Sequence, residues 1–383
     1  MNILHINVAG IKDRFYDILF EHIRQVGNPN QDVYIAYKQG DYENNELLRL
    51  KEYHEDIKPI LSPIKNNIDR LMYFSKIKKY FNDLETKTKV KEYEIIHAHS
   101  LFSDGGVAYK ANKKYQIPYI VSIRITDIDI FLKYFVHLKP FMKVILTNAS
   151  HIIFLSPSLK TSLLEKIESK MLISEIEAKS TVLPNAIDGF WLENIHNRSR
   201  DQKQSIKLIQ VGKLTKGKNT KTTIYAVQEL KSRGIDVALD VVGSGKEIKR
   251  LEKLVNRLGV ESNVKFHGFI DSKWELLRLY RNADFFVLPS YFETFGIVYI
   301  EAMSQGLPVI YTKGQGIDGY FKDGEVGFSI DPFSSKEICE AIIKISKSYD
   351  EISKRCTKLT SSFNWIDITK EYCKFYETYK KGR

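Results

Sequence analysis

The residues from 283 to 310 constrain the fold of this chain more than any other stretch. An apolar run over 283–288 is closed by Pro289, which is typical of a buried strand. Apolar residues recur at helical spacing from Ile297 onward, and a second apolar run begins at residue 307. The stretch therefore predicts a strand, a loop, a helix beginning close to Ile297, and a second strand.

Two glutamates flank the start of this predicted helix. Glu293 falls in the loop before it, and Glu301 lies more than one turn inside it. Free backbone N–H groups at a helix start can receive an anion such as a diphosphate, and Gly296 lets a ligand approach the backbone closely. Carboxylates cannot bind phosphate, but they can accept hydrogen bonds from the hydroxyls of a ribose and a sugar. The pattern indicates a nucleotide-sugar pocket; an ordinary Rossmann-type unit with two solvated glutamates is the alternative.

The residues around these glutamates resemble the retaining, GT-B-fold glycosyltransferases of family 4. The resemblance is carried by Glu-x7-Glu over 293–301, by Phe-Gly at 295–296 and by Glu-Ala-Met-x-x-Gly-x-Pro-Val over 301–309. It implies an α/β fold of two Rossmann-like domains facing across a cleft, with a C-terminal helix crossing back to the N-domain. It also implies a hexosyltransferase that needs no metal and no cofactor beyond a nucleotide-sugar co-substrate.

The same resemblance assigns the diphosphate site to two lysines. Gly-Lys-Leu-x-x-x-Lys over 212–218 stands where relatives have Gly-Arg-Leu-x-x-x-Lys, whose Arg and Lys clasp the diphosphate. A leaving diphosphate needs cationic stabilisation, which Lys213 and Lys218 would supply. Lysine at 213 keeps the charge but loses the planar fork of arginine. A pair of solvated loop lysines is the alternative.

The remaining donor-site residues follow from the resemblance as well. Glu301 is expected at the ribose, Glu293 at the sugar hydroxyls, and the turn at Gly243 beside the nucleotide. In relatives the backbone near Ile270 holds the base, so side chains do not name the nucleotide. The predicted donor-binding set is Gly212, Lys213, Lys218, Gly243, Ile270, Glu293, Thr294, Phe295, Gly296, Ile297 and Glu301, with Glu293, Lys218, Lys213 and Arg124 as its catalytic members.

The first half of the chain also predicts strands that alternate with helices, but it matches fewer motifs of the family. Strands ending near Gly10, His99 and Arg124, together with Asp127, form the predicted acceptor or sugar side. Relatives often have a histidine where Arg124 stands; arginine cannot act as a base, but it binds phosphate or carboxylate well. Pairing of Arg124 with Asp127, and a purely structural His99, are the alternatives. Asp127-x-Asp129 matches a metal signature of another fold, but three residues are too few to predict a metal, and none is expected.

Two basic, aromatic-rich segments predict contact with an anionic membrane surface. Ser62-Pro63 is a favourable helix start, and from Lys65 to Lys91 eight basic residues stand against three acidic ones. Residues 64–91 therefore fit a basic amphipathic helix resting on a bilayer, with an ordinary surface helix as the alternative. Residues 133–143 mix lysines with aromatic residues and offer a second acceptor or membrane face.

Net charge and composition limit the partners of the chain. A formal charge of +11 implies an anionic partner, and no zinc finger or RNP-type motif indicates nucleic acid. There is no signal-peptide pattern and no apolar run long enough to span a membrane. Three cysteines without metal-ligand spacing predict a reduced compartment. We expect a cytoplasmic protein, with a peripheral position on the inner face of the membrane.

The 383 residues are enough for two domains with separate cores. The predicted organisation is an N-terminal Rossmann-like acceptor domain over 1–190, a polar linker over 191–205, a nucleotide-sugar domain over 206–365, and a crossing helix over 366–383.

The function that best fits these features is transfer of a sugar from a nucleoside diphosphate sugar to a glycan or lipid-linked acceptor. A UDP-sugar is favoured as donor, in cell-surface polysaccharide synthesis. A nucleotide-sugar epimerase of the same fold is one alternative. A non-catalytic GT-B binding subunit is another, because Arg124 and Lys213 depart from the family pattern.

Overall fold

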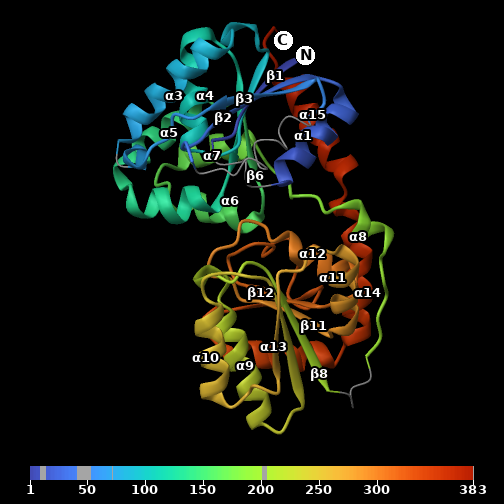
Figure 1. Cartoon of the computed structure of the whole chain (residues 1–383). Helices are drawn as coiled ribbons and strands as arrows, with labels where there is room; N and C mark the ends of the chain where they lie inside the picture. The colour runs from blue at the N-terminus through green and yellow to red at the C-terminus, as the bar shows by residue number, and fades with distance from the viewer. Residues whose placement is uncertain (9–13, 41–52, 71, 201–204, 383) are drawn as a thin grey trace. The chain divides into compact units, whose positions relative to one another are not determined.

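A computed structural model describes residues 1–8, 14–40, 53–70, 72–200 and 205–382. The chain divides into two compact units (Figure 1). The first comprises Met1–Leu155, Lys160–Leu183 and Trp365–Arg383, and the second comprises Ser156–Leu159 and Pro184–Asn364. Each unit is a parallel sheet covered by helices, so the predicted pair of Rossmann-like α/β units is confirmed.

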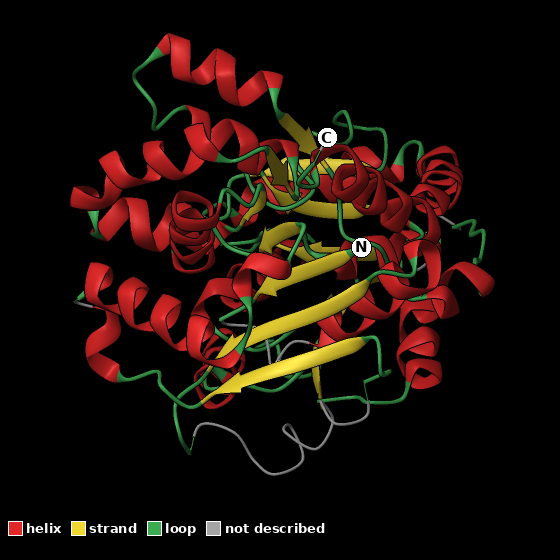
Figure 2. Cartoon of the chain, turned by 90° about the horizontal axis from the view of Figure 1, so that it is seen from above, coloured by secondary structure: helices red, strands yellow, loops and turns green. Residues whose placement is uncertain are grey.

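The first unit is built on a seven-stranded sheet in the order β3-β2-β1-β4-β5-β6-β7. Its strands are β1 (Asn2–Ile6), β2 (Asn30–Ala36), β3 (Ile57–Ser62), β4 (Ile95–Ala98), β5 (Tyr119–Ile123), β6 (His151–Phe154) and β7 (Ser180–Val182). Its helices are α1 (Arg14–Gly27), α3 (Tyr73–Lys87), α4 (Ser103–Tyr115), α5 (Lys139–Asn148), α6 (Pro157–Leu164), α7 (Lys170–Ala178) and α15 (Trp365–Tyr379). Short helical turns cover Asn67–Arg70, Val90–Glu92, Asp127–Leu132 and Val136–Leu138. Helices α1 and α15 pack together on one face of the sheet (Figure 1). In the view of Figure 2, helices lie on both sides of the strands.

The second unit is built on a six-stranded sheet in the order β10-β9-β8-β11-β12-β13. Its strands are β8 (Ile206–Val211), β9 (Val237–Val242), β10 (Val264–Gly268), β11 (Phe285–Leu288), β12 (Val309–Thr312) and β13 (Gly327–Ile330). Its helices are α8 (Gly189–Glu193), α9 (Thr220–Ser232), α10 (Ile248–Leu258), α11 (Lys273–Asn282), α12 (Ile297–Ser304), α13 (Ser335–Ser346) and α14 (Tyr349–Thr360). Short turns of 3-10 helix cover Lys216–Lys218 and Ser361–Phe363.

The central strands are buried along most of their length, as expected for a parallel sheet covered on both faces. β11 lies between β8 and β12, with Phe285 opposite Leu208 and Phe286 opposite Val309. All four of its residues are buried, because helices pack on both faces. The apolar run over 283–288 that the sequence marks as a strand is therefore the middle of the second core.

The division between the units differs from the expected boundary at residue 190. Residues from Pro184 onward belong to the second unit, and Ile187 and Trp191 are buried in its core. The Ile187 amide also donates to the Phe363 carbonyl. The chain enters the second unit before the polar stretch that was predicted as the linker, because Ile187 and Trp191 pack into the core of that unit.

The predicted helix start at Ser62-Pro63 is wrong. Ser62 is the last residue of β3, whose register pairs it with Ala36, and its buried hydroxyl donates to Asp83. The helix begins only at Tyr73. Strand pairing with β2 outweighs the local capping signal, because propensity is a weak prior against a complete ladder. Among the helices that the structure describes, none is long and apolar enough to cross a membrane.

Candidate functional site

The strand order of the second unit marks one place on its sheet where a ligand can enter. β8 is the first strand of the second unit, and its two neighbours in the sheet are β9 and β11. The connections therefore run in opposite directions from β8, and the loops after β8 and β11 part at the carboxyl ends of these strands. In open parallel sheets, ligands bind at this point.

Lys218 and Glu293 meet between these two loops. The Lys218 ammonium forms an ion pair with Glu293 Oε2, and the two side chains are 24% and 11% exposed. Ser290 Oγ lies 3.5 Å from the same carboxylate oxygen, and the Glu293 amide donates to Gln315 Oε1 at 3.0 Å. The structure thus brings together one cation and one carboxylate that the sequence places 75 residues apart.

Two polar residues that the sequence analysis missed hold the loop after β8 in place. Asn219 is buried and donates from Nδ2 to the carbonyls of Pro289 at 2.9 Å and Pro332 at 2.6 Å. Gln210 Nε2 donates to the Lys218 carbonyl at 3.0 Å. Gln210 could have been noticed as a polar residue near the end of a buried strand. These bonds fix the backbone that carries Lys218 beside the loop after β11.

Glycines bring the loops after β8 and β9 into backbone contact. A Cβ on Gly243 would lie 2.0 Å from the Gly212 carbonyl oxygen, and the φ of Gly243 is +135°. A Cβ on Gly245 would lie 2.1 Å from the Leu214 carbonyl oxygen. No side chain fits at either distance, so the Gly-x-Gly turn is a packing requirement as well as an opening for a ligand.

The start of α12 lies where the sequence predicts it. Gly296 adopts a left-handed conformation with φ +81°, and the helix begins at Ile297. The first amides of the helix are therefore available at the carboxyl edge of β11. The Phe295 side chain is buried against Tyr320, so only its backbone can face a ligand.

Glu301 does not join the Lys218–Glu293 pair. The Tyr280 hydroxyl lies 3.4 Å from Glu301 Oε2, and the Trp191 side chain also donates to Glu301. Burial raises the pKa of Glu301 to about 7, and the Tyr280 hydroxyl partly offsets this. Glu301 therefore exchanges a proton close to neutral pH. Its expected contact with a ribose stays a prediction.

The other predicted donor residues lie at the same edge of the sheet. Lys213 is exposed in the loop after β8, and in the described part of the chain it forms no ion pair. Thr294 is half-buried, and its carbonyl accepts a hydrogen bond from Ser156 Oγ at 3.1 Å. Ile270 is half-buried just beyond the end of β10.

The first unit places Arg124 and Asp127 in one loop but does not join their side chains. Arg124 Nε donates to the His99 carbonyl at 3.0 Å, and its guanidinium lies 5.4 Å from the Tyr16 ring centroid. Asp127 accepts backbone N–H groups of Leu101 and Arg124. Burial raises the pKa of Asp127 to about 6 despite these bonds. Asp127 thus organises the loop backbone, and Gly10 lies outside the described residues.

Three buried histidines lie where β1 and β4 end. His5 Nδ1 is 3.1 Å from His99 Nε2, and His5 Nε2 is 3.2 Å from Gln31 Oε1. Because Gln31 Nε2 donates to the Phe20 carbonyl, its oxygen must accept from His5, which leaves His5 Nδ1 as the acceptor from His99. Burial lowers the pKa of His5 to about 3 and holds the pKa of His97 and His99 well below the usual value.

This histidine cluster is the one group of potential metal ligands within the described ranges. His97 is already hydrogen-bonded to Tyr376 at 2.8 Å and to Ser122 at 2.9 Å. The ring nitrogens of His5 and His97 therefore have partners from the protein itself. The geometry fits a hydrogen-bonded core network.

Comparison with known proteins finds glycosyltransferases. Residues 193–361 match the family model of glycosyl transferases group 1. An uncharacterized glycosyltransferase of Methanocaldococcus jannaschii is 28% identical over 309 residues, covering 75% of this chain and 76% of the relative. The fold matches sucrose-phosphate synthase of Thermosynechococcus elongatus with a TM-score of 0.77 at 20% identity, over 99% and 98% of the two chains. It also matches Anabaena HepE in complex with UDP and glucose, with a TM-score of 0.69 at 19% identity, over 99% and 100%.

The two Rossmann-like units, the charged site and these matches identify the chain as a glycosyltransferase of the GT-B fold. The match to the family model of glycosyl transferases group 1 lies in the second unit and includes Lys218, Glu293 and Glu301.

Proposed function

We propose that the chain is a retaining glycosyltransferase of the family 4 type that needs no metal. It would transfer a sugar from a UDP-sugar to a glycan or lipid-linked acceptor. The observation that carries the proposal is the Lys218–Glu293 pair, which lies between the loops after β8 and β11, inside the matched domain. The Anabaena neighbour, described in complex with UDP and glucose, favours UDP among the nucleotides.

The two charged groups divide the reaction between them. When the glycosidic bond to the donor phosphate breaks, the diphosphate gains negative charge, and the ammonium of Lys218 stabilises it. Lys213, exposed in the same loop, adds a second positive charge. Glu293 accepts hydrogen bonds from sugar hydroxyls and so orients the anomeric carbon. The ion pair keeps both side chains in position before the donor arrives, which lowers the entropic cost of ordering them.

A binding experiment tests the donor class. We expect UDP to bind in the presence of EDTA, more tightly than GDP, ADP or CMP, and Lys218→Ala to weaken UDP binding by roughly 10- to 100-fold. Lys336→Ala removes a charge from the exposed surface of α13 and serves as the matched control. Absence of binding for all four nucleotides, or equal affinity of the two variants, would overturn the proposal. The anomeric configuration of the product, read by NMR, tests retention.

An apolar patch on the first unit favours a lipid-linked acceptor. The patch consists of Met72, Phe74, Ile130, Tyr134 and Val136, and Phe74 and Tyr134 are 56% and 68% exposed. Phe74 contacts Phe141 with ring centroids 5.3 Å apart, which joins the two basic segments of the sequence. Residues 130–148 contain no acidic residue, and the Lys133 ammonium lies 5.4 Å from the Tyr134 ring centroid.

The basic segment over 64–91 exposes less free positive charge than the sequence suggests. Lys76 is buried and donates to Ser103, while Lys79 pairs with Asp69 and Lys87 with Asp83. We therefore expect binding to an anionic bilayer to depend on inserted apolar side chains as well as on charge.

Vesicle sedimentation tests this surface. We expect the double variant Phe74→Ser/Tyr134→Ser to lose most of the co-sedimentation with phosphatidylglycerol-containing vesicles. The pair Phe333→Ser/Ile366→Ser, which removes two other exposed apolar side chains, should behave as the unmodified chain. Equal sedimentation of both double variants would argue against the patch.

A further inference from the structure

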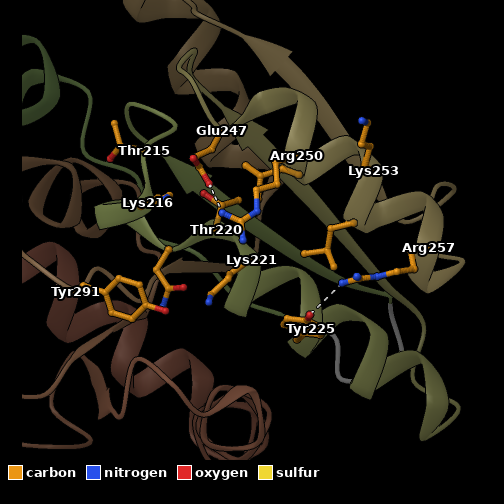
Figure 3. Close-up of a pocket in the computed structure, with 13 residues that line it drawn as sticks. Thr215, Lys216, Thr220, Lys221, Tyr225, Glu247, Arg250, Lys253, Arg257 and Tyr291 are labelled. Atoms are coloured by element: carbon orange, nitrogen blue, oxygen red, sulfur yellow. Dashed lines mark hydrogen bonds and ion pairs between the residues drawn. The ribbon is translucent and has the colours of Figure 1, made fainter.

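A second concave site lies between α9 and α10 of the second unit. Its cavity measures about 560 Å³ and is lined from the loop after β8, from both helices and by Tyr291 (Figure 3). None of Lys213, Lys218, Glu293 or Glu301 lines it. The groove is thus separate from the donor site, although Lys216 belongs to the same loop as Lys218.

The groove has a strong excess of positive charge. Its only acidic lining residue is Glu247, which lies 3.5 Å from the Arg250 guanidinium. The cationic side chains that line it are Lys216, Lys221, Arg250, Lys253 and Arg257 (Figure 3). For the residues that the structure describes, no ion pair with a carboxylate involves Lys216, Lys221 or Lys253. Neighbouring like charges repel each other, and a bound anion would remove this repulsion.

The cations are distributed along the groove. Arg250, Lys253 and Arg257 recur at intervals of three and four residues and so share one face of α10. At 1.5 Å per residue they extend over about 10 Å, which exceeds the size of a single phosphate or carboxylate. Lys221 and Tyr225 face them from α9, and Arg257 donates to the Tyr225 hydroxyl at 3.3 Å. A ligand that neutralises this row must carry several anionic groups in succession.

The uncharged lining indicates what connects those anionic groups. Leu251 and Leu254 are buried apolar residues of the lining. The rings of Tyr225 and Tyr291 also line the groove (Figure 3). Aromatic rings and apolar side chains bind the apolar faces of sugar rings, and guanidinium groups bind carboxylate or phosphate through bidentate hydrogen bonds. The volume is typical of a site for a small molecule or a short oligomer rather than for a folded partner.

We propose that this groove binds an acidic oligosaccharide, a segment of the acceptor polymer that bears carboxylate or phosphate groups on successive sugars. The inference rests on the proposed transfer to a glycan and names the chemistry of that glycan. The groove would hold the polymer away from its reacting end, which favours repeated transfer to the same chain.

Titration calorimetry with defined oligosaccharides tests the groove. The probes are an oligogalacturonate, an oligosaccharide phosphorylated on successive rings, and a neutral maltooligosaccharide of equal length. We expect at least one acidic probe to bind at low salt more than tenfold tighter than the neutral one, and the acidic probe that binds identifies the anionic group. The triple variant Arg250→Gln/Lys253→Gln/Arg257→Gln should weaken it at least tenfold. Tyr225→Leu, which keeps every charge, should weaken it several-fold.

The matched control removes three exposed charges elsewhere in the second unit. Lys347→Gln/Lys354→Gln/Lys358→Gln lowers the net charge equally and should bind the acidic probe as the unmodified chain does. Equal losses in the two triple variants, no binding of either acidic probe, or tighter binding of single-stranded RNA than of the oligosaccharide would each overturn the inference. The groove variant should keep its UDP affinity, so that failure of the groove and failure of the donor site give different results.

Discussion

The two units have equivalent strand orders but opposite chemistry where their loops part. In the first unit, β1 and β4 end in three histidines that are buried and held neutral. In the second unit, the loops after β8 and β11 carry a lysine and a glutamate that are partly exposed and form an ion pair. A shared topology thus supplies the location of a site, and the side chains at that location decide whether it becomes a dry core network or a ligand site.

The difference also shows in how closely the backbones approach. The loops after β8 and β9 in the second unit meet through glycines, because no side chain would fit between their backbones. The histidines of the first unit instead pack against aromatic rings, with His5 4.6 Å from Phe20 and His99 5.0 Å from Tyr16 between ring centroids. The predictions below separate a charged ligand site from a neutral core network.

The largest effect is expected at the charged site. Glu293→Gln should lower the transfer rate by roughly 10²- to 10³-fold, because an amide orients the sugar hydroxyls less well than a carboxylate and leaves Lys218 without its partner. UDP binding should persist within a few-fold, as measured by calorimetry. Glu275→Gln, on the exposed surface of α11, is the control. Full transfer by Glu293→Gln would remove the proposed role of this residue.

The second largest effect is expected where the loop after β9 contacts the backbone of the loop after β8. Gly243→Ala places a methyl group against the Gly212 carbonyl and should lower the free energy of unfolding by about 3 kcal/mol. Gly234→Ala also has a positive φ, but no atom lies within 4 Å of the added Cβ. We expect it to cost only about 1 kcal/mol. Denaturation with urea compares the two, and equal costs would contradict the packing argument.

The neutral network should respond to acid. The pKa of His5 falls from 6.5 to about 3 on folding, so below pH 6.5 the unfolded chain binds a proton that the folded chain does not. Stability is therefore lost as the pH falls from 6.5 towards 3, by about 2 to 3 kcal/mol at pH 4.5 from this group alone.

The variant His5→Asn isolates the contribution of His5 to the loss of stability at low pH. Buried Asp104, whose pKa rises to about 7, acts in the opposite direction but is present in both proteins. We expect unfolding free energies measured at pH 7.5 and 4.5 to differ less in the variant by about the stated amount. Parallel pH profiles for the two proteins would show that His5 is charged in the folded state.

The smallest effect concerns Glu301. With a pKa of about 7, it is mostly protonated at pH 6 and ionised at pH 8, and only the ionised form accepts two ribose hydroxyls. Affinity for UDP-glucose should therefore rise by up to about tenfold over this interval and be nearly constant in Glu301→Gln. UDP-glucose is a better probe than UDP for this measurement, because its diphosphate has no proton to lose between pH 6 and pH 8. An unchanged slope in the variant would separate Glu301 from the donor.

Local patterns predicted much of the second unit. The strand before Pro289, the helix beginning at Ile297 and the turn at Gly243 all depend on residues close together in the chain, and each lies where expected. The resemblance assigned Lys218 to the diphosphate and Glu293 to the sugar hydroxyls, but it did not predict the ion pair between them. The supports from Gln210 and Asn219 were missed, because a polar residue at a strand end gives no indication of its partner across the sheet.

The sequence by itself determined the class of fold, since periodicity and short motifs record local backbone preferences. It also supplied, through the resemblance, the residues of the proposed donor site. Only the tertiary structure decided that Ser62 ends a strand, that Asp127 binds backbone amides, and that His5, His97 and His99 form one cluster. The cationic groove between α9 and α10 likewise needs two helices packed side by side. Such contacts join residues far apart in the chain, and the energy that selects them comes from burial and pairing that no local pattern encodes.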